Sequence, residues 1–258
     1  MLRFVAVALL VGTTTAAAQA NPNPVPKDPS EWPQHSLTRP KPPVVIPGAM
    51  AGTGAPSDAI VLFGGASLDA WRLADTTLKP APWTMVDGAM EVAPGTGSIM
   101  TRQSFGDIQL HLEWRAPTPP KGDGQERGNS GVFFMNRYEV QVLDSWNNPT
   151  YADGQAGAIY GQFPPKVNAT RPPGEWQSYD IIFHRPHFDA DGRLTVPARL
   201  TVFLNGILVQ EDQMLLGPTS HTVRTPYAAH AEQLPLQLQD HGVKVRFRNI
   251  WVRELGDG

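Results

Sequence analysis

Short runs of alternating apolar and polar residues, separated by turn pairs, fill the chain from residue 57 onward. The clearest is LTVFLNGILVQ, in which Asn205-Gly206 suits a type I′ turn between two apolar-rich runs. Such runs predict strands, because successive side chains on a strand point to opposite faces. The expected strands are residues 59–62, 83–86, 89–92, 99–101, 108–115, 131–135, 138–143, 177–184, 198–204, 207–211, 234–240 and 245–254.

Many short strands at near-regular spacing, with no convincing long amphipathic helix, indicate an all-β fold. We expect a jelly-roll β-sandwich of two antiparallel sheets. The chain has 258 residues, of which 41% are hydrophobic, which is enough for a large core. It has no cysteine, so this core would be held without disulfides. We expect Trp71, Trp114, Trp176 and Trp251 to lie in it.

The first 56 residues differ in character from the rest. Residues 1–20 combine Arg3, a short apolar stretch and small residues ending at Ala20, which is typical of a secretory signal peptide. An uncut membrane anchor is the alternative, although the apolar stretch is too short to span a bilayer. Residues 21–56 are rich in proline and read as a linker or an arm draped over the domain, which would occupy 57–258. We therefore expect a periplasmic or secreted protein.

The charge pattern narrows the classes of partner. The formal net charge is -3, and the chain has no basic run of the kind that binds nucleic acid. No stretch after the signal is long and apolar enough to span a membrane, so we expect no transmembrane segment in the mature chain.

Three of the expected strands carry Glu, Gln, His and Arg on the face opposite their apolar one. Side chains on one face of a strand repeat every ~6.6 Å, which suits contacts to successive hydroxyls of a sugar ring. A solvated outer sheet is the alternative interpretation, since polar exposed faces are common. The residues are His111, Glu113 and Arg115 in 108–115, Glu139 and Gln141 in 138–143, and Gln237, Gln239 and His241 in and just after 234–240.

Four motifs together resemble the 3-keto-disaccharide hydrolase domain family. They are IVLFGGASLDAWR, GNSGVFFMNRYEVQVLDSW, GAIYGQFPP and LPLQLQDHGVKVRFRNIWVREL, and the resemblance covers about residues 59–255. It implies a concanavalin-like jelly roll whose concave sheet bears the site. It also implies an exported bacterial protein that acts on glycosides oxidised to a ketone at carbon 3.

A ketone at carbon 3 acidifies the proton at carbon 2. A base can remove this proton, the enolate can expel the aglycone from carbon 1, and water can then add. This chemistry needs a base, a group that stabilises the enolate and an acid for the leaving oxygen.

The sequence offers three candidates for acid–base work. His241 is the first, because an unperturbed histidine titrates near ~6.5; capping the turn before Gly242 is its alternative role. Glu139 is the second acid–base candidate or a metal ligand, and a cross-strand ion pair is equally open. Glu113, two residues from His111 on one strand face, could contribute to a metal or sugar site.

Other residues are candidates for substrate binding. Arg115 could stabilise an enolate oxygen, Gln141 and Gln239 could hold hydroxyls, and Asp240 lies between Gln239 and His241. Two candidates precede a strand, Arg127 and Asn129, although flanking glycines make a turn-forming role at least as plausible. An aromatic platform is expected from Trp146 with Tyr151, or else these are loop or core anchors.

Two questions stay open at this level. A divalent metal could polarise the ketone, but no strong ligand spacing is present, and FHRPHFDADG at 183–192 reads as a solvated hairpin loop. The competing function is a non-catalytic carbohydrate-binding module on the same fold. A retaining glycosidase is weakly supported, because the run from Glu139 to Asp144 lacks a second glutamate.

Overall fold

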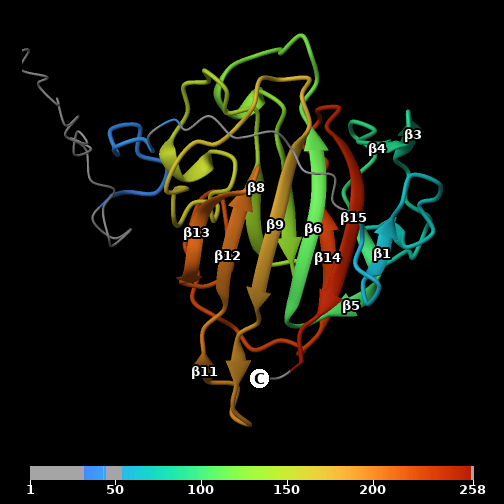
Figure 1. Ribbon diagram of the computed structural model, residues 1–258. Helices are drawn as coiled ribbons and strands as arrows, with labels where there is room; N and C mark the ends of the chain where they lie inside the picture. The colour runs from blue at the N-terminus through green and yellow to red at the C-terminus, as the bar shows by residue number, and fades with distance from the viewer. Residues whose placement is uncertain (1–31, 43, 45–53, 257–258) are drawn as a thin grey trace, which may run out of the picture.

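The computed structural model describes residues 32–42, 44 and 54–256. Nearly all of the regular secondary structure from residue 60 onward is strand, and the long strands of the larger sheet run side by side across Figure 1. This sheet has eight strands. Seven follow the order β13 (Ile207–Met214), β12 (Arg199–Leu204), β9 (Gln177–His184), β6 (Ile108–Arg115), β15 (Arg246–Glu254), β4 (Ala89–Glu91) and β3 (Thr84–Val86), and β1 (Ile60–Phe63) pairs with β15.

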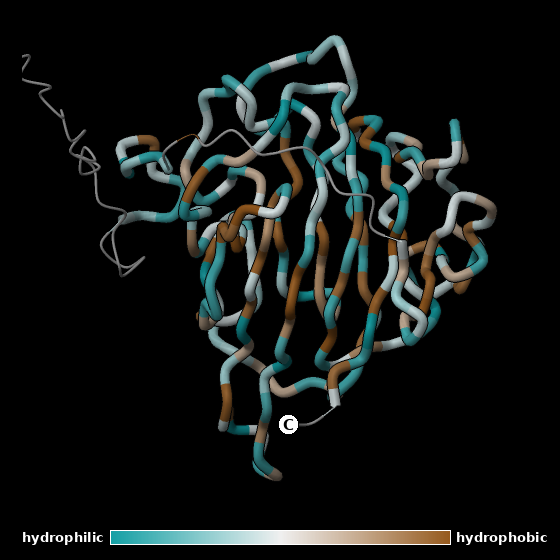
Figure 2. The backbone as a smooth tube through the Cα atoms, in the orientation of Figure 1, coloured by the Kyte–Doolittle hydropathy of each residue, from teal (hydrophilic) through white to brown (hydrophobic). Residues whose placement is uncertain are grey.

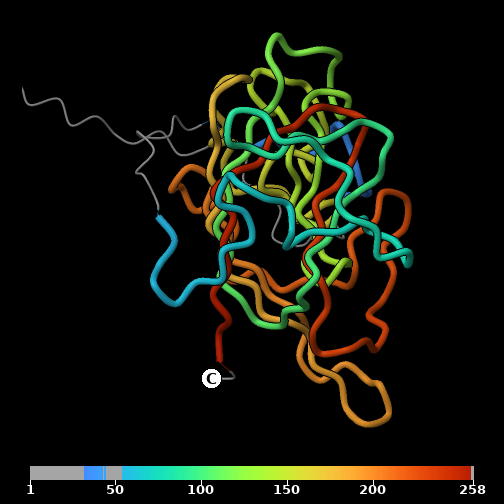
Figure 3. The backbone as a smooth tube through the Cα atoms, turned by 90° about the vertical axis from the view of Figure 1, so that its right-hand side faces the viewer, coloured from blue at the N-terminus to red at the C-terminus, as the bar shows by residue number. Residues whose placement is uncertain are grey.

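The second sheet has five strands and lies behind the first in the view of Figure 1. A separate two-stranded hairpin, β10 (His187–Phe188) with β11 (Leu194–Val196), projects from one end of the molecule (Figure 3). Single 3-10 turns are η2 (Gly124–Glu126) and η3 (Ala152–Gly154). The five strands are, in order, β2 (Trp71–Leu73), β5 (Ile99–Phe105), β14 (Leu234–Leu238), β7 (Ser130–Phe134) and β8 (Tyr138–Val142).

The core lies between the two sheets. Hydrophobic and hydrophilic residues alternate along the strands, as the colours of Figure 2 show, and the apolar face of each sheet is buried. The ring of Phe134 on β7 lies 4.8 Å from that of Phe183 on β9, so side chains of opposite sheets are in contact. The expected all-β jelly-roll sandwich is confirmed.

The alternation located most strands well. The bounds of β6 and β9 agree with the expected ranges residue for residue, whereas β2, β10 and β11 were missed because two or three residues show no alternation. The predicted type I′ turn is confirmed, since φ is 54° at Asn205 and 78° at Gly206. Of the four tryptophans expected in the core, the prediction for Trp176 is wrong. Its side chain is half-buried, and the guanidinium of Arg248 lies 4.0 Å from its ring.

The structure describes only part of the N-terminal segment to which the predictions for residues 1–56 refer. The proposed signal peptide, residues 1–20, lies outside the described residues, as does much of the proline-rich segment 21–56. Residues 32–42 of that segment are described and pack on the domain. The described part of the chain contains no helix that is long and apolar enough to cross a membrane.

Candidate functional site

A cavity of about 480 Å³ opens on the outer face of the five-stranded sheet, over β8. On β8, Tyr138, Val140 and Val142 belong to the core, so Glu139 and Gln141 must point the other way, into this cavity. The lining residues are Gln125, Asn129, Phe133, Glu139, Gln141, Tyr151, Tyr160, Thr219, Ser220, His221, Gln239 and His241.

Glu139 is the one carboxylate that lines this cavity. Its side chain is 5% exposed, and among the described residues no basic side chain forms an ion pair with it. Burial disfavours the charged form and raises the pKa of Glu139 to about 8. A carboxyl group with such a pKa exchanges protons near neutral pH, which is the property required of a general acid or base.

Three amide side chains form a polar cluster beside Glu139. The amide of Gln141 donates a hydrogen bond to Oε1 of Gln125 at 2.8 Å, and that of Asn129 donates to the backbone oxygen of Gln125 at 2.7 Å. The Oε1 atom of Gln141 is buried and has no hydrogen-bond partner within the described part of the chain. It is therefore an acceptor that a hydroxyl group of a ligand could satisfy.

A chain of hydrogen-bonded hydroxyl groups is the second polar feature of the cavity, after the amide cluster. The hydroxyls of Tyr151 and Tyr160 lie 2.7 Å apart, and the Tyr160 hydroxyl lies 3.0 Å from Nδ1 of His221. Burial raises the pKa of both phenols above the ordinary value, and the nearby Glu139 adds to the effect. Both hydroxyls are therefore protonated at neutral pH, and because one donates to the other, the pair has one further O–H that can donate to His221 or to a ligand.

The segment that carries Tyr160 is tied to β8 through the backbone. β8 is the last strand of its sheet, and residues 157–160 pair along its free side. The backbone N–H of Gln141 donates to the oxygen of Ala158 at 3.0 Å, and that of Tyr160 donates to the oxygen of Glu139 at 3.2 Å. These bonds fix the phenol beside the carboxylate.

The end of β14 brings the remaining predicted residues to the cavity. The backbone N–H of Gln239 donates to the oxygen of Gly131 at 3.0 Å, which continues the sheet past β14, and His241 lies exposed on the rim. The cavity thus unites six predicted residues from four segments of the chain: Asn129, Glu139, Gln141, Tyr151, Gln239 and His241.

Glu113 and Arg115, which were predicted as site residues, do not line this cavity. They lie on β6, which is part of the eight-stranded sheet. Glu113 accepts a hydrogen bond from Nε of Arg248 at 2.6 Å, and the guanidinium of Arg115 lies 4.8 Å from the ring of Trp176. Both side chains are engaged on the outer face of the other sheet.

Three more predicted residues lie near the cavity but do not line it. Arg127 donates to Asp144 at 2.7 Å and to the backbone oxygen of Trp146 at 2.7 Å, so these residues stabilise a loop. The carboxylate of Asp240 accepts from the backbone N–H of Gly97 at 3.0 Å and from that of Gly242 at 2.9 Å. The side chains of Arg127 and Asp240 are thus engaged in contacts within the protein.

Sequence reasoning missed several lining residues. Tyr160 lies within the quoted GAIYGQFPP motif but was not singled out, and Gln125 belongs to a single 3-10 turn without periodicity. Thr219, Ser220 and His221 lie in an irregular segment that offers no pattern to read. Tyr151 was named as part of a platform and does line the cavity, whereas Trp146 does not.

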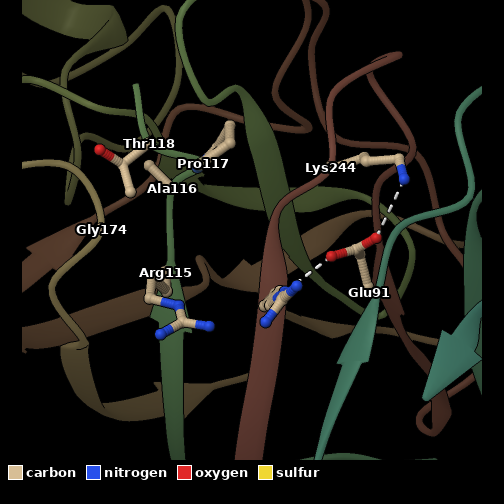
Figure 4. A pocket seen from close by; sticks show the side chains of 8 residues that line it. Glu91, Arg115, Ala116, Pro117, Thr118, Gly174 and Lys244 are labelled. Carbon is tan, nitrogen blue, oxygen red and sulfur yellow. Dashed lines mark hydrogen bonds and ion pairs between the residues drawn. The ribbon is translucent and has the colours of Figure 1, made fainter. Parts of the chain in front are cut away.

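A second cavity, of about 360 Å³, lies on the outer face of the eight-stranded sheet (Figure 4). Its only carboxylate is Glu91, which is held by Arg246 at 2.6 Å and by Lys244 at 3.3 Å. Burial alone would raise the pKa of Glu91, but these partners hold it below the ordinary value. This cavity therefore presents basic side chains and a carboxylate that is already ion-paired, and it does not offer a general base.

The structure also places the residues considered for metal binding. Within residues 32–42, 44 and 54–256, no group of three or more His, Cys, Asp or Glu side chains is arranged to hold a metal ion. In the 183–192 segment, His184 instead lies 2.9 Å from Asp107, and the rest forms the β10–β11 hairpin.

Comparison with known proteins gives the family. The family model of the 3-keto-alpha-glucoside-1,2-lyase-like domain matches residues 58–253. The chain belongs to this family. The 3-keto-alpha-glucoside-1,2-lyase-like domain therefore spans both sheets, from β1 to all but the last residue of β15, and the resemblance read from the four motifs is confirmed.

Solved structures agree with this assignment of the lyase-like domain. A proposed glycosyl hydrolase from Parabacteroides distasonis ATCC 8503 is 46% identical, with a TM-score of 0.76 over 84% of this chain and 93% of that one. A second proposed glycosyl hydrolase from the same organism is 22% identical, covers 76% and 99%, and has a TM-score of 0.55, which supports the fold. No curated protein matches the chain.

Proposed function

We propose that this protein is an exported enzyme that cleaves the glycosidic bond of 3-keto-glycosides by proton abstraction at carbon 2, elimination and hydration. The observation that carries the proposal is Glu139, a buried carboxyl group without an ion-pair partner in the described chain, facing a polar cavity. Family membership supports a glycoside as substrate, and the likeness of the domain to 3-keto-alpha-glucoside-1,2-lyase is the reason for proposing the 3-keto class.

In the first step, the carboxylate of Glu139 takes the proton from carbon 2. The electrons of that C–H bond form an enolate with the oxygen on carbon 3. A carboxyl group whose pKa is raised to about 8 is a stronger base than an ordinary glutamate, because its desolvated anion gains more from accepting the proton. The Tyr151 and Tyr160 hydroxyls are the nearby donors for developing negative charge.

In the second step, the enolate re-forms the ketone and the bond between carbon 1 and the aglycone oxygen breaks. A double bond forms between carbons 1 and 2, and the leaving oxygen takes a proton from an acid, for which His241 at the rim is the candidate. Water then adds to carbon 1, and carbon 2 regains a proton. Asn129, Gln141 and Gln239 are suited to hold the sugar hydroxyls.

The mechanism is tested by incubating the purified protein with a 3-keto-α-glucoside in D₂O and following the products by mass. We expect aglycone release together with one deuterium at carbon 2, which simple displacement at carbon 1 would not introduce. A reaction without enzyme controls for spontaneous exchange, and a chelator arm decides whether a divalent ion takes part. Equal cleavage of the unoxidised glucoside would point to an ordinary glycosidase, and binding without release to a carbohydrate-binding module.

The proposal includes export to the periplasm or the medium. It rests on the signal-like residues 1–20. Cell fractionation with detection of the mature chain tests it.

A further inference from the structure

Residues 32–42, which precede the matched family segment 58–253, pack against the back of one wall of the cavity. In Figure 1 this segment is the blue loop beside the yellow-green loops at one edge of the sandwich. The wall consists of Tyr151, Tyr160 and the segment 219–221. We call residues 32–42 the arm.

His35 is the residue through which the arm contacts this wall. Its ring lies 4.3 Å from the ring of Tyr151, 5.3 Å from that of Tyr160 and 5.0 Å from that of His221, measured between centroids. Its Nε2 atom donates to the backbone oxygen of His221 at 2.6 Å. One side chain of the arm thus contacts three residues that line the cavity.

Gln34 adds a second attachment at the same place. Its amide nitrogen donates to the backbone oxygen of Ser220 and, at 3.3 Å, to that of His221. This approach requires glycine at position 161, because a Cβ there would collide with the Gln34 amide. Gly161 also has a φ of +68°, which other residues adopt at a cost.

The arm is anchored by buried charge next to Tyr151. Asp153, in the turn after Tyr151, accepts from the backbone N–H of His35 at 3.3 Å and lies 3.7 Å from NH1 of Arg39. Burial alone would raise the pKa of Asp153, but His35 and Arg39 hold it below the ordinary value. Both Arg39 and Asp153 are almost fully buried, so this part of the arm is integral to the packing.

We propose that the arm is a working part of the substrate site, with His35 as the positioning residue that holds the wall of Tyr151, Tyr160 and His221 in place. The inference rests on the proposed function, because this wall is taken to contact the sugar. Aromatic faces and hydroxyls together suit a sugar ring, and a wall that moves by even a fraction of an ångström loses that fit. Cleavage after Ala20 would leave the arm in the mature chain.

The test compares two full-length variants, His35→Ala and Leu37→Ala. Leu37 lies in the same arm but is 71% exposed, so its removal controls for altering the segment. Hydrogen–deuterium exchange at the amides of residues 158–161 and 219–222 is expected to speed up in His35→Ala and to stay unchanged in Leu37→Ala. Unchanged exchange in His35→Ala would overturn the inference without reference to any substrate.

Kinetics on the 3-keto-glucoside supply the functional readout. We expect His35→Ala to raise KM about tenfold, because the wall contacts the sugar, and to lower kcat as well, because the same wall carries the Tyr151 and Tyr160 hydroxyls assigned to the developing negative charge. A merely unfolded fraction would lower apparent kcat and leave KM unchanged, and that result, or an unchanged KM, would count against the arm. If the wild-type protein does not turn over the 3-keto-glucoside, the proposed function is wrong. The role of the arm is then decided separately, by the exchange data together with calorimetric measurement of sugar binding.

Discussion

A carboxylate oxygen of Glu139 occupies the space that a side chain at Gly131 would fill. The two residues lie on neighbouring strands, β7 and β8, and Glu139 lines the cavity. Gly131 has no positive φ to explain its presence, so the requirement at this position is room for the carboxylate.

Replacing Glu139 should abolish catalysis without unfolding the domain. We expect Glu139→Gln to lower kcat at least about 10²-fold, because the amide has the same shape but cannot take a proton. The matched control is Glu113→Gln, which removes a carboxylate from β6 on the other sheet and should leave kcat unchanged. Equal losses in both variants, measured by aglycone release, would remove Glu139 from its assigned role.

Adding one methyl group at Gly131 should displace the carboxylate. Gly131→Ala places a Cβ against Glu139 and the ring of Phe133, and we expect at least a tenfold loss of kcat and about 1–3 kcal/mol of stability. Gly64→Ala is the control, since its Cβ would meet only an ordinary contact at 3.5 Å. Full activity in Gly131→Ala would show that the position of Glu139 is not critical.

The raised pKa of Glu139 predicts that the free energy of unfolding depends on pH. The folded state keeps this proton up to about pH 8, whereas the unfolded chain loses it near 4.5. The folded state therefore binds more protons in this window, so the free energy of unfolding should fall as pH rises, by up to about 1.4 kcal/mol per pH unit relative to Glu139→Gln. Urea unfolding of both proteins at pH 5, 6.5 and 8 measures the difference. Parallel curves would contradict the raised pKa.

His241 should matter for rate but not for stability. The side chain is exposed at the rim, so His241→Ala is expected to change the free energy of unfolding by less than about 0.5 kcal/mol while lowering kcat about 10²-fold. His184→Ala serves as control, because His184 binds Asp107 and does not line the cavity. A normal rate in His241→Ala would transfer the acid role to another group, with His221 the next histidine to test.

Export predicts a defined mature end. The small residues before Asn21 indicate cleavage after Ala20, so intact mass analysis of the protein from a periplasmic or culture fraction should begin at Asn21. A full-length chain recovered with the membranes would instead favour the uncut anchor.

Alternation in the sequence predicted most of the longer strands and their two faces, although the short strands β2, β10 and β11 were missed. It correctly separated Leu110, Leu112 and Trp114 from Glu113, and Val140 from Glu139. It could not assign a strand to a sheet, because both sheets bury one face and show the same period. For that reason Glu113 on β6 was grouped with Glu139 on β8, although the two strands lie in different layers.

The remaining parts of the cavity depend on contacts between distant segments. His221 and Thr219 come from irregular chain, and His35 comes from a proline-rich segment that was expected only to connect or drape. No local pattern encodes such contacts, since they arise when loops meet over a finished sheet.

The pairing of residues 157–160 with β8 has a further consequence for the behaviour of the molecule in solution. An uncovered outermost strand is a template on which a second molecule can add its own strand and start aggregation. Here the hydrogen-bonding groups of that strand are already taken by the segment that brings Tyr160 to Glu139. The same few backbone hydrogen bonds thus protect the edge of the sheet from self-association and hold Tyr160 in the cavity. A substitution that weakens these bonds should therefore both promote aggregation and disturb the cavity.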